Sequence, residues 1–128
     1  MRVIAGRWKG RRLTAPSGEA VRPTTDRVKE ALFNILGPSV TGAVVLDLCC
    51  GSGGLGIEAL SRGAARAVFV DDHPRSLDAA RSNLETCGAE STSYRLIRAD
   101  AENWLGEWRP PDDGAGWILL ADPPYRTG

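Results

Sequence analysis

The feature that most limits how this chain can fold is a glycine-rich turn between a strand and a helix. Residues 43–48 form an apolar run interrupted by a single acid, which predicts a buried strand. Gly51, Gly53 and Gly56 follow in the spacing G-x-G-x-x-G, and residues 57–62 then predict a helix. Glycines at these positions let the backbone turn sharply and approach a ligand closely. The pattern therefore predicts an α/β fold with a ligand at the turn.

Three further apolar segments extend this pattern along the chain. Residues 67–70, 94–99 and 117–121 each predict a short strand, and helical segments separate them. Strands that alternate with helices form a mostly parallel sheet, because parallel neighbours need a long crossover connection. We therefore expect a single α/β domain of the Rossmann-like kind.

Two acids bear on what the glycine turn binds. Asp71 comes twenty residues after Gly51, at the end of the second strand, where an acid can accept both hydroxyls of an adenosine ribose. A dinucleotide would also satisfy this pattern. Asp47, however, lies four residues before the first glycine, where a pyrophosphate would meet a second negative charge. S-adenosylmethionine carries an ammonium and a sulfonium, so Asp47 favours the methyl donor.

A third acid follows the strand at 94–99. In the expected geometry Asp100 accepts the N6 amine of adenine, and Ala101 offers its backbone N–H to the ring. The alternative is that Asp100 only caps a helix over residues 101–105, and the two roles are compatible. The candidate cofactor contacts are therefore Asp47, Gly51, Ser52, Gly53, Gly56, Asp71, Asp100 and Ala101.

The string Asp122-Pro123-Pro124-Tyr125, directly after the strand at 117–121, predicts the catalytic centre. Two prolines remove two backbone donors and leave carbonyl oxygens free to accept hydrogen bonds. An exocyclic amine on a nucleobase needs acceptors for its N–H groups and a surface on which its ring can stack. Asp122 and Pro123 would supply the acceptors, and Tyr125 the stacking surface. Paired prolines after a strand are also common in plain turns.

The charge distribution divides the chain, although its net charge is zero. Residues 1–30 hold eight basic and three acidic residues, a net charge of +5, and the remainder holds eight basic and thirteen acidic residues, a net charge of −5. This asymmetry predicts a basic arm that meets RNA phosphates and an acidic body that holds a cationic cofactor. Trp8 would stack on a base or, equally, close the arm onto the body. The candidate RNA contacts are Arg7, Trp8, Lys9, Arg11, Arg12, Arg22 and Arg27.

A helix is predicted over residues 26–36, between the arm and the glycine-turn region. Its apolar stripe is expected to pack on one face, with Arg27 and Lys29 off the stripe and free to reach substrate or cofactor. The stripe consists of Val28, Ala31, Leu32, Ile35 and Leu36.

The remaining composition excludes several classes of protein. No apolar run approaches the ~18 residues of a membrane span, and the first residues do not form a secretory leader. Three cysteines, two of them adjacent, and one histidine give neither a disulfide framework nor a metal-ligand pattern. We therefore expect a cytoplasmic protein without a metal.

Two amino-terminal strings carry a resemblance to a known family, residues 1–13 (MRVIAGRWKGRRL) and 22–34 (RPTTDRVKEALFN). With the glycine turn, residues 58–64 (EALSRGA) and the Asp-Pro-Pro-Tyr string, they make the chain resemble the bacterial 16S rRNA (guanine-N2)-methyltransferases of the RsmD type over essentially all of its length. Cys49 and Cys50 depart from the family, whose members usually have an aromatic and a small residue there.

The resemblance implies a class I S-adenosylmethionine-dependent methyltransferase with strand order 3-2-1-4. It implies a basic β-hairpin arm over residues 1–21, a methyltransferase domain over 22–128, and 16S rRNA in an assembling small ribosomal subunit as substrate. Family members normally continue beyond the catalytic string, so we expect the last strands to be missing, which would expose strand 117–121 to self-association. An adenine-N6 DNA methyltransferase, or a fragment that binds cofactor or RNA without turnover, remains an alternative.

Overall fold

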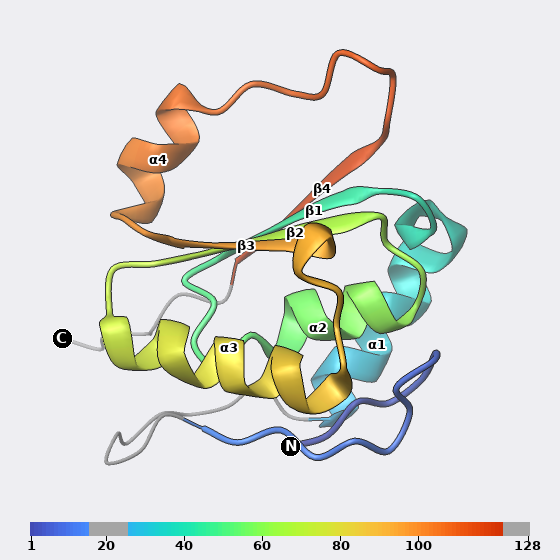
Figure 1. Ribbon diagram of the computed structural model, residues 1–128. Coiled ribbons are helices and arrows are strands. Elements are labelled where there is room, and N and C mark those ends of the chain that lie inside the picture. The colour runs from blue at the N-terminus through green and yellow to red at the C-terminus, as the bar shows by residue number, and fades with distance from the viewer. Residues whose placement is uncertain (16–25, 122–128) are drawn as a thin grey trace, which may run out of the picture.

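The computed structural model describes residues 1–15 and 26–121, and its core is a four-stranded parallel sheet of order β3-β2-β1-β4 (Figure 1). This confirms the predicted fold class and strand order. Short 3-10 helices occupy Gly37–Val40 and Ser91–Ser93. The strands are β1 Val44–Leu48, β2 Arg66–Asp71, β3 Tyr94–Arg98 and β4 Trp117–Ala121, and the helices are α1 Asp26–Leu36, α2 Gly54–Ser61, α3 Pro74–Cys87 and α4 Ala101–Glu107.

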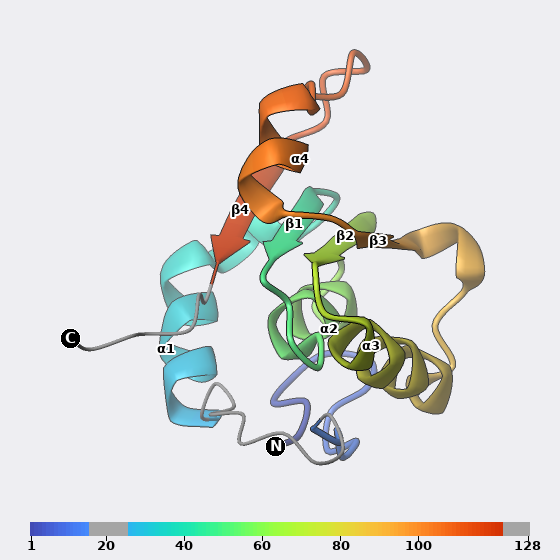
Figure 2. The same cartoon turned by 90° about the vertical axis from the view of Figure 1, so that its left-hand side faces the viewer.

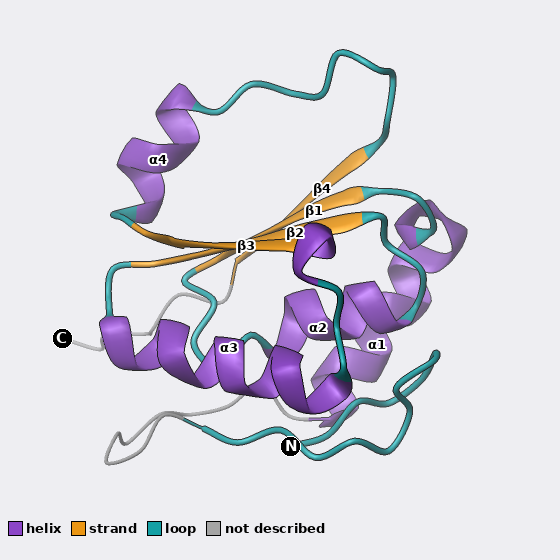
Figure 3. Ribbon diagram, viewed as in Figure 1, coloured by secondary structure: helices purple, strands orange, loops and turns teal. Residues whose placement is uncertain are grey.

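The sheet divides the described residues into two unequal layers. Helices α1, α2 and α3 and the amino-terminal segment lie on one face of the sheet, and α4 lies on the other (Figures 1 and 2). Val45, Phe69 and Leu120 point from the strands into the first layer, where they join the buried core beneath α2 and α3. Figure 3 shows the same layering by element type. We call the α4 side the outer face of the sheet.

The outer face is only partly covered. Side chains of registered residues in parallel strands share a face, and Val44 is in register with Arg66 and with Trp117. Trp117 and Leu119 are 47% and 42% exposed. Strand β4 therefore presents apolar side chains to solvent as well as an edge without a further partner strand among the described residues.

The amino-terminal segment forms the expected hairpin, but it is docked onto the body. Arg2 and Arg12 form an antiparallel bridge, and backbone bonds from Val3 N to Arg11 O and from Gly10 N to Val3 O close the turn. The side chains of Val3, Trp8 and Leu13 are buried in the same core as the sheet. The arm therefore shares the hydrophobic core of the body. The expected boundary at residue 21 lies outside the described residues.

Helix α1 has the predicted bounds, but only part of the predicted apolar stripe faces the core, where Leu32 and Leu36 pack. Val28 and Ile35 are 56% and 82% exposed, whereas Lys29 and Phe33 are buried. Lys29 is drawn inward because its ammonium meets the buried carboxylate of Glu58, with 3.4 Å between Nζ and Oε1. A buried charge with a partner can occupy a core position, and a pattern of apolar residues cannot reveal that pairing.

Within the described residues, no helix is long and apolar enough to cross a bilayer. The same part of the chain holds no group of three or more His, Cys, Asp or Glu side chains that could bind a metal ion.

Candidate functional site

The predicted cofactor residues lie where β1 and β2 end, at the carboxyl edge of the sheet. Parallel α/β sheets bind ligands at this edge, because the loops that follow neighbouring strands meet there. Gly51 and Gly53 have φ angles of 55° and 84°, in the left-handed region that glycine adopts without strain. Cys49, with a φ of 54°, is the one non-glycine residue within 1–15 and 26–121 that shares this region, so the backbone is strained where β1 enters the turn.

Gly56 is required by close packing. A Cβ atom built at this position would lie 2.3 Å from Cε1 of Phe69 and 3.1 Å from Oδ2 of Asp47. Phe69 lies on the sheet with no solvent exposure, so its ring has little room to move aside. The third glycine of the motif therefore lets α2 sit directly on β2.

Asp47 reaches the glycine turn from beneath. Its Oδ2 accepts a hydrogen bond from the backbone N–H of Gly56 at 2.9 Å, and the residue is only 1% exposed. In phosphate-binding turns, amides in the first turn of the helix are the donors that face the anion. Here one of these amides is engaged by a protein carboxylate. Because Asp47 is buried, it could act on a ligand at the turn only through its negative charge and not through a direct contact.

Asp71 connects the end of β2 to the same turn. Its Oδ2 accepts from the N–H of Gly51 at 3.0 Å, and its Oδ1 accepts from the N–H of His73 at 2.9 Å. Each carboxylate oxygen has a second acceptor position, so ribose hydroxyls can still bind. The two hydrogen bonds from backbone amides fix the carboxylate beside the turn, which is the position that a ribose contact would require.

Asp100 caps α4, as the alternative interpretation stated. Its Oδ1 accepts from the N–H of Asn103 at 3.0 Å, and the residue is exposed. Ala101 is the first residue of α4 and is half-buried. The cap engages Oδ1 of Asp100, and a carboxylate has further acceptor positions, so the cap and adenine recognition are compatible.

The carboxyl edge is acidic, and its negative charge affects the pKa of the Cys49 thiol. The pKa of the Cys49 thiol is raised, first by burial and then by the negative charges of Asp71, Asp72, Asp47 and Asp100. A site with this charge favours a cationic ligand and disfavours a phosphate. The donor set therefore fits S-adenosylmethionine, with its ammonium and sulfonium, better than a dinucleotide.

Asn83, on α3, joins the glycine turn to the arm, and sequence reasoning missed it. Its Nδ2 donates to the carbonyls of Ser52 and Thr14, both at 3.0 Å. Its Oδ1 accepts from the N–H of Thr14 at 2.9 Å and from the Thr14 hydroxyl at 3.2 Å. Asn83 is 2% exposed, so these bonds are shielded from water. A single polar residue in an amphipathic helix gives no signal of such a bridge.

Glu58, on α2, is a second buried connection that the sequence did not reveal. Its carboxylate accepts from the N–H groups of Ile4 and Ala5 at 2.9 and 3.1 Å. It also pairs with Lys29 and, at 2.7 Å, with Nε of Arg62. Lys29 in turn donates to the carbonyl of Arg2 at 2.6 Å, so it does not reach substrate or cofactor as expected. Hydrogen bonds between the arm backbone and the side chains of Glu58 and Lys29 thus anchor the arm to α2 and α1.

Of the predicted RNA contacts in the arm, the tryptophan is buried and the basic side chains are exposed. Trp8 is 6% exposed, and the Arg7 guanidinium lies 4.4 Å from the centre of its ring. Trp8 therefore cannot stack on a base in this structure, and the alternative, that it closes the arm onto the body, is the one observed. Arg11 donates to the carbonyl of Thr86 at 3.0 Å. Lys9 and Arg12 are exposed.

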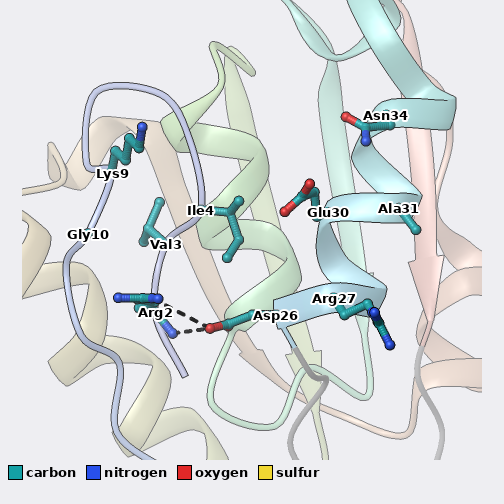
Figure 4. A pocket seen from close by; sticks show the side chains of 10 residues that line it. All are labelled: Arg2, Val3, Ile4, Lys9, Gly10, Asp26, Arg27, Glu30, Ala31 and Asn34. Carbon is teal, nitrogen blue, oxygen red and sulfur yellow. Dashed lines mark hydrogen bonds and ion pairs between the residues drawn. The ribbon is translucent and has the colours of Figure 1, made fainter.

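A groove of about 670 Å³ separates the hairpin from α1. Lys9 and Gly10 lie on the hairpin side, and Glu30 and Asn34 lie on the α1 side, with Arg27 further along that helix (Figure 4). Arg2 closes one end through its pair with Asp26, at 3.7 Å. None of the candidate cofactor residues lines this groove, so it is distinct from the cofactor edge.

Four predicted site residues lie outside the described residues. They are Arg22 of the arm and Asp122, Pro123 and Tyr125 of the catalytic string.

Comparison with known proteins identifies a family. Residues 1–128 match the family described as Conserved hypothetical protein 95. The chain is 48% identical over 127 residues to YlbH, a candidate rRNA methyltransferase of Bacillus subtilis, and covers 67% of it. It is 40% identical over 128 residues to ribosomal RNA small subunit methyltransferase D of Escherichia coli strain K12, and covers 62% of that protein.

Solved structures agree with this match. The candidate methyltransferase yhhF of Escherichia coli superimposes with a TM-score of 0.81 at 37% identity, over 98% of this chain and 65% of that one. The candidate methylase HI0767 of Haemophilus influenzae gives a TM-score of 0.73 at 34% identity, over 98% of this chain and 65% of that one. The chain thus spans about two thirds of the length of these relatives.

Proposed function

The chain belongs to the family described as Conserved hypothetical protein 95, and on that premise we propose that it transfers a methyl group from S-adenosylmethionine to the exocyclic N2 amine of a guanine in 16S rRNA. Ribosomal RNA small subunit methyltransferase D of Escherichia coli supports the substrate class by its name. The observation that carries the proposal is the acidic carboxyl edge, where the carboxylates of Asp47 and Asp71 accept hydrogen bonds from the glycine-turn amides of Gly56 and Gly51 at 2.9 and 3.0 Å. This charge suits a methyl donor with two positive groups.

The described residues would divide the binding of the cofactor among them. Asp71, fixed by the amides of Gly51 and His73, would accept the ribose hydroxyls. Asp100 and Ala101 would meet the adenine ring, and Asp47 would stabilise the positive charges through its field. The glycines would let the backbone approach the methionine part.

The chemical step would take place at the string that follows β4. S-adenosylmethionine, when bound, supplies an electrophilic methyl group. The guanine amine is a weak nucleophile because its lone pair is delocalised into the ring. Asp122 and the Pro123 carbonyl would hold its two hydrogens, turn the lone pair out of the ring plane and stabilise the positive charge that develops on nitrogen. Tyr125 would stack on the base. Positioning of this kind lowers the barrier without a covalent enzyme intermediate.

RNA would be held through cations of the amino-terminal region. Trp8 is buried and is not a proposed contact. The proposed phosphate contacts are Arg7, Lys9, Arg11, Arg12, Arg22 and Arg27. The target base must leave its stack to reach the Asp-Pro-Pro-Tyr string, so a loop guanine in an assembling small subunit is the proposed substrate. The exposed apolar side chains of β4 support a second proposal, self-association of this chain through that strand.

A split between binding and transfer tests the proposed role of Asp122. We expect Asp122→Ala to abolish methyl transfer to small subunits and to leave the dissociation constant of S-adenosylhomocysteine within about threefold, since the substitution removes a substrate contact only. Asp112→Ala removes the same kind of charge from the exposed loop before β4 and serves as the matched control. Transfer by Asp122→Ala at the rate of the control would remove Asp122 from the mechanism.

A further inference from the structure

A second cavity, of about 310 Å³, opens on the outer face of the sheet, near the strand ends opposite the cofactor edge. Arg66 is the first residue of β2 and Asp71 the last, so the cavity lies about 16 Å from the carboxyl edge at the ~3.3 Å rise of each strand residue. Val68 is in register with Arg95 of β3, and Val44 with Arg66. Arg66 and Arg95 therefore project from the same face of the sheet, on neighbouring strands.

The charge of this cavity has one sign. Arg66, Arg95 and Arg109 line it, and no acidic residue is among the described residues that do. Arg109 is committed to its own loop, since its Nη1 donates to the carbonyls of Gly106 and Trp108. Arg66 and Arg95 are exposed, and no salt bridge within the described ranges involves either guanidinium. Both are thus available to an anionic ligand.

One aromatic and two apolar side chains line the cavity beside these cations. Trp108 lines the cavity and is half-buried. Its ring makes a T-shaped contact with Trp117, with 5.1 Å between centroids, and its centroid lies 6.5 Å from that of Trp104. Val44 and Val68 line the same cavity from β1 and β2. Tryptophan held in this way offers a flat surface for a base, while arginines bind phosphate.

We propose that this outer-face cavity, formed by Arg66, Arg95, Arg109 and Trp108, binds a nucleotide of single-stranded RNA. The base lies against Trp108 over the two valines, and the flanking phosphates contact Arg66 and Arg95. The inference rests on the proposed RNA substrate and adds a contact to it. The cavity would hold the RNA strand about 16 Å from the carboxyl edge of the sheet, and it shares no lining residue with the arm groove or the cofactor edge.

The test is the salt dependence of binding to a fluorescein-labelled single-stranded RNA decamer, measured by anisotropy between 50 and 300 mM salt. Arg95→Ala should weaken binding about tenfold and reduce the slope of log K against log salt by about 0.7, the value for one lost phosphate contact on a single strand. Arg66→Ala should do the same. Arg81→Ala, which removes an exposed arginine from α3 on the opposite face, should leave affinity unchanged apart from a small loss from net charge.

Trp108→Ala should weaken binding about tenfold without changing the salt slope, because stacking does not release counterions. If Trp108→Ala unfolds, the two arginine variants decide the matter. The proposed cavity would be overturned if Arg66→Ala and Arg95→Ala had the same affinity and salt slope as Arg81→Ala. If Lys9→Ala also lost binding in that case, the proposed function would stay intact. Absence of RNA binding by the wild-type chain would overturn both. Equal competition by inorganic phosphate and by a mononucleotide would overturn the base contact.

Discussion

Replacing Glu58 by glutamine should destabilise the protein more than any surface change, because it leaves the Lys29 ammonium buried without a counterion. Both side chains have no solvent exposure and lie 3.4 Å apart. Removing one partner of a buried pair costs about 3–5 kcal/mol. Glutamine also keeps only one acceptor oxygen for the amides of Ile4 and Ala5, and a lost buried bond costs about 1 kcal/mol more. This is a large part of the ~5–15 kcal/mol of a typical domain.

The deficit of Glu58→Gln should shrink as the pH rises. Burial lowers the pKa of Lys29 below its ordinary value, and the Glu58 carboxylate opposes that shift. Without the carboxylate, the pKa of Lys29 in the folded state falls further. Between that pKa and the ordinary value the unfolded chain binds more protons than the folded chain, so stability rises with pH. The variant should therefore recover part of its lost stability between pH 7 and pH 9.

Urea unfolding followed by circular dichroism at pH 7 and pH 9 measures both effects. The double variant Glu58→Gln/Lys29→Met removes both charges and is the matched control, expected to regain at least about half of the loss, since it leaves no unpaired ammonium in the core. A loss below about 1 kcal/mol for Glu58→Gln, or the same loss at both pH values, would refute the reasoning.

Three further predictions address the glycine turn and its surroundings. Gly56→Ala should cost about 1–3 kcal/mol in urea unfolding, because the new Cβ overlaps the Phe69 ring; full stability would contradict the packing. Asn83→Ala should speed amide exchange at the turn, because the Ser52 carbonyl loses its donor, and should weaken S-adenosylhomocysteine binding about tenfold by calorimetry; unchanged values would contradict the bridge. The thiols of Cys49, Cys50 and Cys87 should react slowly with a disulfide reagent at pH 8, since burial raises their pKa values; rapid labelling would contradict that burial.

The sequence predicted the fold well where the pattern is local. The strand order was implied by the family resemblance, whereas the glycine turn followed by a helix and the alternation of strand and helix segments correspond to β1, α2 and the parallel sheet, because each segment is short and bounded by turns. The end of β2 at Asp71 was predicted for the same reason. The glycine turn and the strand ends depend on neighbours in the chain, so the spacing of residues is enough to predict them.

Features that depend on distant partners were missed. The buried face of α1 includes Lys29, whose partner Glu58 is 29 positions away and on another helix. Asn83 makes its bonds to Thr14 and Ser52, 69 and 31 positions away. Trp8 was left open between two roles, because only the docking of the hairpin decides whether its ring is covered. Periodicity describes the exposure of a residue's own element and gives no information on such pairings.

The most direct test of the central claim is to identify the methylated nucleoside. The protein is incubated with radiolabelled S-adenosylmethionine and small ribosomal subunits that lack their guanine-N2 methyl groups, and the RNA is then digested to nucleosides and separated. The account predicts label in N2-methylguanosine. Label in N6-methyladenosine would contradict the proposed substrate, and no label from this chain beside an active longer relative would contradict its activity as an enzyme.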